Sequence, residues 1–324
     1  MTAIALPALR SDDSLGFLAA LGALELLTTV EGLEVGLGWD GLGGEATLVV
    51  DLPDTDAVAE RLRSVAVRLQ SEDRLVPADK DLILRRWSTT DKQARREAGI
   101  EEKNDPMRGP PLVIRDRLQG VATLEAGGDR ATARWAAGLV TMLAVDRTGM
   151  ALMTPLYAPA GQQVLAQLLE KYLAFAVAPG LLDEALFGWR RRPDGGANLD
   201  YRDLRDAAWS ARGSAENASV PGAIWLALMA TPIFRQCGSG RRGEAVGWRR
   251  GARAVRPRTF RWPVWEEPRS IEAVEVMLSH PAVCQSPGKP GDLRALGISA
   301  VCEATRAALR NGDGPLRAAR VVWP

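Results

Sequence analysis

The pattern of apolar and polar positions predicts a clear order of elements over the first 75 residues. Residues 3–9 predict a strand, and the polar run SDDS that follows supplies capping side chains for a helix. Residues 15–27, LGFLAALGALELL, are apolar on nearly every side, which predicts a buried helix rather than an amphipathic one. Residues 33–39 and 45–52 predict two strands joined by a glycine-rich turn, and 54–70 a helix. Strand, helix, hairpin, helix is the opening of a ferredoxin-like βαββαβ unit.

The middle of the chain changes from irregular to helical. Residues 76–130 are expected to be the least regular part of the chain. Their stretch RRWSTTDKQARREAGIEEKNDPMRGPP is polar and mixed in sign, which suits a mobile loop or a segment ordered only by a partner. Apolar-rich stretches then predict a series of helices. These cover 131–145, 161–177, 181–189, the amphipathic stretch 200–212, and 220–234, which is expected to be buried.

The last third mixes both kinds of element. Residues 244–255 and 258–267 predict strands, and 271–280 a helix capped by Ser270. The predicted fold class is therefore α+β. Three regions are expected: a ferredoxin-like N-terminal unit at 1–75, an irregular basic loop followed by a helical region at 76–215, and a mixed region with arginine-rich strands at 216–324.

Composition limits the class of protein. Hydrophobic residues make up 46% of the 324 residues and charged residues 25%, which is globular composition. The single histidine, His280, and three cysteines show no CxxC spacing, so a standard structural zinc site and a disulfide framework are excluded. The start of the chain has no basic region typical of a signal peptide, and prolines interrupt its longest uncharged stretches. We expect a cytoplasmic protein without a membrane span.

Two motifs invite a chemical interpretation. In CGSGRRG, Gly238, Gly240 and Gly243 have GxGxxG spacing, but a dinucleotide site needs a strand before and a helix after the motif. Here the predicted order is the reverse, which favours a flexible loop between a helix and a strand. A loop whose arginines touch phosphates is the functional alternative.

The acids Asp200, Asp203 and Asp206 have helical spacing and could hold a metal or act as a general base. Arg202 and Arg205 alternate with them, which is more typical of a solvated helix with local ion pairs. No GxSxG, Walker or HExxH motif occurs. The sequence predicts no catalytic residue, no metal and no cofactor.

The distribution of charge is more informative than the net charge of +1. The first 60 residues contain eleven acidic residues and one basic residue, whereas 235–261 contains nine arginines and one acid, Glu244. Arginine forks bind phosphates, and interleaved aromatic rings can stack on unpaired bases. The alternative is that the tryptophans fill the core while the arginines solvate an exposed face. The predicted nucleic-acid-binding residues are Arg235, Arg241, Arg242, Trp248, Arg249, Arg250, Arg253, Arg256, Arg258 and Arg261, with a second cluster of Arg85, Arg86, Lys92, Arg95 and Arg96 and a weaker third at Arg190, Arg191 and Arg192.

Three stretches carry a family resemblance. DDSLGFLAALGALELL at 12–27, GAIWLALMATPIF at 222–234 and RPRTFRWPVWEEP at 256–268 together resemble the type I-U (I-G) CRISPR-associated large-subunit-like proteins. Together they cover about a quarter of the chain. Glu25 stands where that group tends to have an arginine, which argues against a backbone contact at that position.

The resemblance implies a non-enzymatic subunit of an RNA-guided antiviral complex. Its partners would be guide RNA, target DNA with its flanking motif, other effector subunits and a helicase-nuclease. Two alternatives from other classes stay open. One is a metal-dependent nuclease or hydrolase that uses the carboxylates at 200–206, and the other is a protein-only assembly scaffold.

Overall fold

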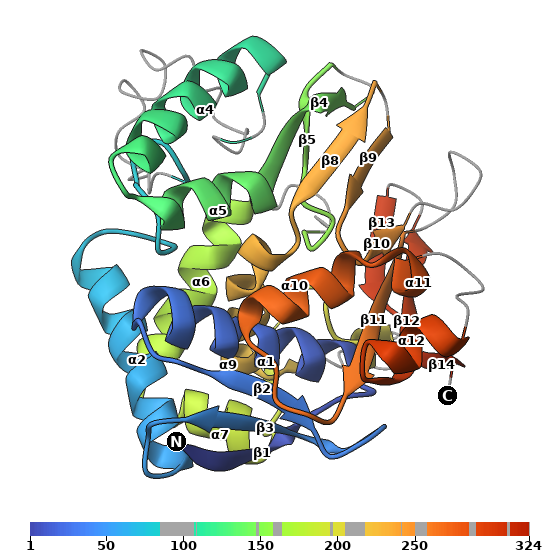
Figure 1. The fold of residues 1–324 in the computed structure, drawn as a ribbon. Coiled ribbons are helices and arrows are strands. Elements are labelled where there is room, and N and C mark those ends of the chain that lie inside the picture. Colours follow the sequence, from blue (N-terminus) through green and yellow to red (C-terminus); the bar gives the residue numbers. More distant parts are fainter. Residues whose placement is uncertain are drawn as a thin grey trace, which may run out of the picture.

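The computed structural model describes the fold over most of the chain. The described residues are 1–84, 107, 109–146, 149–157, 164–194, 197–204, 218–240, 242–249, 258–284, 290–309 and 312–323. Helices and several separate sheets are both present, so the predicted α+β class is confirmed (Figure 1). One hydrophobic cluster extends from the N-terminal sheet to the last strands.

The N-terminal elements follow the predicted order. They are β1 (Thr2–Arg10), α1 (Ser14–Glu25), β2 (Gly36–Trp39), β3 (Glu45–Val50) and α2 (Thr55–Ser71). The three strands form an antiparallel sheet in the order β1-β3-β2. Within the described residues no fourth strand lies beside β1, so the complete ferredoxin-like unit stays a prediction.

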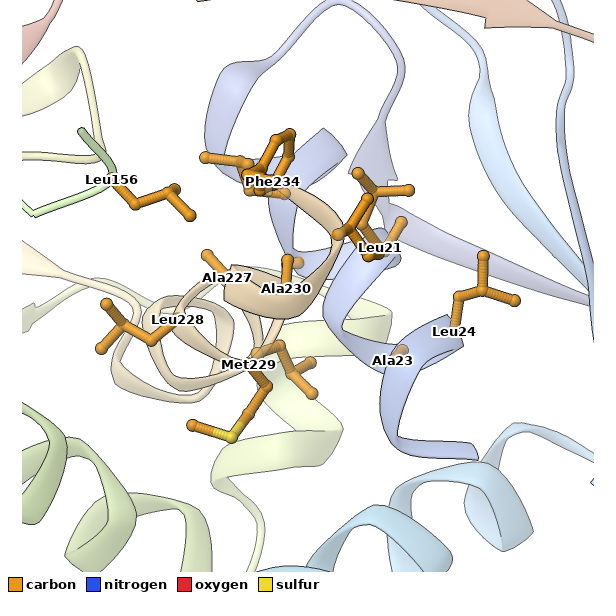
Figure 2. Close-up of a cluster of buried hydrophobic side chains, with 14 of the residues drawn as sticks. Leu21, Ala23, Leu24, Leu156, Ala227, Leu228, Met229, Ala230 and Phe234 are labelled. Atoms are coloured by element: carbon orange, nitrogen blue, oxygen red, sulfur yellow. The ribbon is translucent and has the colours of Figure 1, made fainter. Parts of the chain in front are cut away.

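Helix α1 is buried along its whole length, as its sequence predicts. Asp13 caps it, accepting hydrogen bonds from the amides of Leu15 and Gly16. It packs against α9 (Pro221–Met229), whose residues are all buried too. Figure 2 shows Leu21 and Leu24 of α1 in the same apolar cluster as α9. The π-helical turn η1 (Leu26–Val30) continues α1 beyond Glu25.

Two predictions for the middle region are wrong. The expected loop contains helix α4 (Pro111–Ala126), because Pro111 has the fixed φ angle of a first helical turn and needs no hydrogen-bond acceptor. The expected helix 131–145 ends early. Helix α5 (Arg130–Leu139) is followed by strand β4 (Val140–Val145), which pairs with β5 (Ala151–Met153). The predicted helices at 161–177 and 181–189 correspond to α6 (Leu165–Val177) and α7 (Leu181–Phe187).

The C-terminal half is built on a seven-stranded sheet in the order β13-β12-β11-β10-β9-β8, with β14 also paired to β12. The strands are β8 (Gln236–Ser239), β9 (Arg242–Ala245), β10 (Trp248–Arg249), β11 (Thr259–Trp265), β12 (Ile298–Leu309), β13 (Gly312–Leu316) and β14 (Arg320–Trp323). The remaining elements are β6 (Arg192–Pro193), β7 (Ala218–Ser219), the 3-10 turn η2 (Thr231–Ile233), α10 (Ile271–Ser279), α11 (Pro281–Cys284) and α12 (Pro290–Ala295).

The glycine-rich CGSGRRG stretch is part of this sheet. Instead of the expected loop, β8 and β9 form a hairpin in which Gly238 pairs with Gly243. Gly240, at the turn, has a φ of +63°, which glycine adopts without strain. The helix at 271–280 and its cap Ser270 are confirmed by α10.

Aromatic side chains join the two sheets through α1. The Phe17 ring of α1 lies 5.6 Å from the Trp262 ring of β11, and Trp262 stacks on Phe260 at 4.9 Å. The indole N–H of Trp262 donates to the Ser11 carbonyl at 2.8 Å, and that of Trp265 donates to the Leu37 carbonyl at 2.6 Å. Residues 1–75 therefore share their core with strands more than 200 residues later.

No single helix among the described residues has the length and apolar character of a membrane span. Helices α6 and α7 reach that length only as a pair bent by 89°.

Candidate nucleic-acid interface

Alternation along β10, β11 and β12 gives the seven-stranded sheet an apolar face and a polar face. Trp248 pairs with Phe260, which pairs with Ala304, and these residues face the core. Side chains of the next residues point to the opposite face, because successive side chains in a strand alternate. We call this opposite side the outer face.

The first row of the outer face crosses three strands. Arg249 pairs with Thr259, and Thr259 pairs with Thr305. The two threonine hydroxyls lie 3.1 Å apart, so both side chains share this face. The amide of Arg317 donates to the Thr305 carbonyl at 2.9 Å, which places Arg317 at the end of the row.

The second row is a charged triplet. Arg261 pairs with Glu303, and Glu303 pairs with Arg320. Arg261 donates to Oε2 of Glu303 from Nη2 at 2.6 Å and from Nε at 3.2 Å. Arg320 donates to Oε1 from Nη2 at 2.7 Å and from Nε at 3.2 Å. Burial alone would raise the pKa of Glu303, but the hydrogen bonds from Arg320 and Arg261 hold it below its ordinary value.

Exposure differs sharply within this set of arginines. Helices α10, α11 and α12 pack over part of the outer face, and Arg261 also donates to the Val283 carbonyl of α11 at 3.5 Å (Figure 1). The Arg261 side chain is 8% exposed, whereas that of Arg320 is 75% exposed. Arg317 is exposed and Arg249 half-buried, and in the described part of the chain neither forms an ion pair.

Two predicted contact residues are unsuited to that role. Trp248 is 4% exposed, and its ring stacks on Phe260 at 4.9 Å, so it has no free face for a base. Arg261 is buried and occupied by Glu303. The sequence suggested an exposed basic strand around Arg261 and already offered core packing as the alternative for the tryptophans. In the structure β10 and β11 are interior strands whose second face is also partly covered by helices.

Three other predicted contact residues lie away from the two rows of the outer face. Arg235 is 56% exposed and lies 3.4 Å from Glu275, a buried carboxylate that also binds Arg134. Arg242 lies in β9. Arg258 is half-buried and, with Trp248 and eight other residues, lines a cavity of about 10 Å³, which has room for about one water molecule. This cavity is too small for a base.

The remaining predicted residues lie outside the described part of the chain. They are Arg241, Arg250, Arg253 and Arg256 of the main segment and Arg85, Arg86, Lys92, Arg95 and Arg96 of the second cluster. The third cluster is described, and two of its arginines have partners there. Arg192 binds Glu184, and Arg191 donates to the Ala218 carbonyl.

Sequence reasoning missed a buried arginine behind Trp248. Arg306 is fully buried and donates from Nη1 to the carbonyls of Asn198 and Gly314, and from Nη2 to those of Pro155 and Leu156, all within 3.0 Å. Its guanidinium carbon lies 5.0 Å from the centre of the Trp248 ring. Arg306 therefore binds several loops to the core, a role that no local motif indicates.

The acids at 200–206 are not the solvated face that their spacing suggested. Asp200 is fully buried and Asp203 is 3% exposed, while Asp206 lies outside the described residues. Arg202 binds Asp200 at 3.0 Å and reaches Asp13, the cap of α1, at 2.8 Å. Burial raises the pKa of Asp13, and the nearby Arg202 offsets part of this rise. These charges form an interior network.

Potential metal ligands are scattered in the described residues. No group of three or more His, Cys, Asp or Glu side chains there could hold a metal ion. The three cysteines are free, and His280 accepts a hydrogen bond at Nδ1 from the Ala282 amide at 3.2 Å, so it joins α10 to α11.

Comparison with known proteins adds no relative. No protein-family model matches the chain, and no curated protein matches it significantly.

Proposed function

We propose that this protein is a non-enzymatic nucleic-acid-binding subunit of an RNA-guided complex, and that the outer face of its seven-stranded sheet contacts the phosphate backbone. One observation supports this proposal most directly. Arg249, Arg317 and Arg320 lie on one polar face, where Glu303 is the carboxylate in the row of Arg320.

A phosphate backbone suits this face chemically. Guanidinium forks match phosphate oxygens, and the hydrogen-bonded pair of Thr259 and Thr305 hydroxyls between them has one O–H left to donate to the same oxygens. The rings behind the sheet are buried, so the exposed groups offer charge and hydrogen bonds rather than stacking. Such contacts position a nucleic acid without reading its sequence.

The resemblance to the CRISPR-associated proteins supports the wider assignment. Its three stretches are far apart in the sequence, yet they form α1, α9 and β11, which pack together in the core. Under this proposal the protein works in the cytoplasm with guide RNA, target DNA, other effector subunits and a helicase-nuclease. Sequence would then be read by guide pairing rather than by this face.

A salt series tests the proposal. Labelled single-stranded and duplex DNA and RNA are titrated with the purified chain and with the double variant Arg249→Ala/Arg317→Ala. If both arginines contact phosphates, the variant binds more weakly to every sequence, and its log–log salt slope falls by about 2. Arg63→Ala is the control, because Arg63 pairs with Glu60 on the surface of α2. A folded double variant with unchanged affinity and slope would contradict the proposal, and salt-insensitive binding to an acidic protein would favour the scaffold alternative.

A further inference from the structure

We infer that Glu303 is a positioning residue that holds Arg320 as the anchoring phosphate contact of the outer face. This inference rests on the proposed function of that face. It concerns β14, a strand whose arginine the basic-segment pattern did not single out.

Glu303 is a nearly buried carboxylate that can orient an exposed arginine side chain. It is 7% exposed, and each of its two oxygens receives two hydrogen bonds from a different arginine. Arg261 is buried and also bound to the Val283 carbonyl, so it fixes the carboxylate from the core side. Arg320 takes the other oxygen and is itself 75% exposed.

The contacts leave part of Arg320 ready for a ligand. A guanidinium has five N–H donors, and Arg320 directs those on Nε and Nη2 to Glu303. The donors on Nη1 make no contact with Glu303. An arginine held in one orientation loses less rotamer freedom on binding than a free one, so its contact is stronger. Arg317 has no carboxylate partner of this kind in the described chain and serves as a matched comparison.

Charge alone makes the opposite prediction. The triplet of Arg261, Glu303 and Arg320 has one net positive charge, which attracts phosphate. Removing the charge of Glu303 would raise the net charge by one and strengthen binding if attraction were all that mattered. If Glu303 acts by orienting Arg320, the same change weakens binding. The sign of the effect therefore separates the two explanations.

The experiment measures affinity for a labelled oligonucleotide over a salt series. Arg320→Lys keeps the charge and removes the fork, and we expect it to weaken binding by roughly 3- to 10-fold, the equivalent of ordering one side chain. Arg317→Lys should lose less affinity than Arg320→Lys, because no carboxylate of the described chain orients Arg317. Arg63→Lys, on the surface of α2, is the control and should bind like the wild type. Glu303→Gln should also weaken binding despite its added positive charge, and the double variant Glu303→Gln/Arg320→Lys should be no weaker than Arg320→Lys.

Two results would overturn the inference. One is wild-type affinity in Arg320→Lys, and the other is tighter binding by a folded Glu303→Gln. If Glu303→Gln fails to fold, the comparison of Arg320→Lys with Arg317→Lys tests the inference without it. Both side chains are exposed, so neither substitution should disturb folding. If only this inference is wrong, Arg249→Ala/Arg317→Ala still binds nucleic acid more weakly than the wild type. If the proposed function is wrong, the affinity of that double variant is unchanged as well.

Discussion

Replacing Gly22 with alanine tests the close contact between α1 and α9. A Cβ atom at Gly22 would lie 1.7 Å from the carbonyl oxygen of Leu226 and 2.5 Å from its carbonyl carbon. Ordinary contact begins near 3.4 Å, so the helices would have to separate by about 1.7 Å. The opposing atoms are backbone atoms, so a rotamer change cannot relieve the clash. Helix α9 is buried along its whole length, so it can move away from α1 only by displacing other core side chains.

The magnitude follows from two opposing terms. Alanine stabilises a helix interior by about 1 kcal/mol relative to glycine. Overpacking a core costs about 1–3 kcal/mol, and a backbone clash belongs at the upper end. We expect a net loss of about 2 kcal/mol. With an unfolding entropy of roughly 2 cal/mol/K per residue, this lowers the Tm of a protein of this size by about 3 °C.

The assay is thermal unfolding followed by circular dichroism, with Gly291→Ala as the control. Gly291 lies in α12, where an added Cβ meets no atom within 4 Å, so this variant should melt at or above the wild-type temperature. If Gly22→Ala melts at the wild-type temperature, the backbones of α1 and α9 are not in close contact at Gly22 and Leu226.

Two further outcomes are expected. Arg306→Met should lower the free energy of unfolding by about 3 kcal/mol or more, measured by urea unfolding, because four carbonyls, three of them in buried hydrogen bonds, lose their donor; an unchanged midpoint would contradict this. The purified chain should not cut DNA or RNA with magnesium or manganese, since Asp200 and Asp203 are buried, and cleavage that disappears in Asp200→Ala would instead support a nuclease.

Local features of the sequence predicted most of the regular elements. The SDDS run and the all-apolar stretch after it define α1, because capping and hydrophobic pattern act over a few residues. The stretch VTMLAV was harder, because a short apolar run suits both a helix and a strand, and its pairing with β5 decides the outcome. Prediction was therefore best where neighbouring residues determine the structure.

The candidate site could be predicted only in part. The density of arginines between 235 and 261 indicated a basic region, but burial of Arg261 depends on Glu303, 42 residues later. Asp200 is buried because Arg202 joins it to Asp13, which lies 189 residues before that arginine. Arg317 and Arg320 enter the site through strand pairing with β12, which no local pattern reveals.

The sharing of one core by distant segments affects how the protein is made. Helix α1 leaves the ribosome long before β11, since Ser11 and Trp262 are 251 residues apart. At about 5–20 residues per second, α1 waits roughly 10 to 50 seconds for the strand that covers it. During that time the nascent chain presents the largely apolar surface of α1, which is a target for chaperones. Slow codons placed between α1 and residue 262 should therefore reduce the yield of intact protein more than those placed after residue 262.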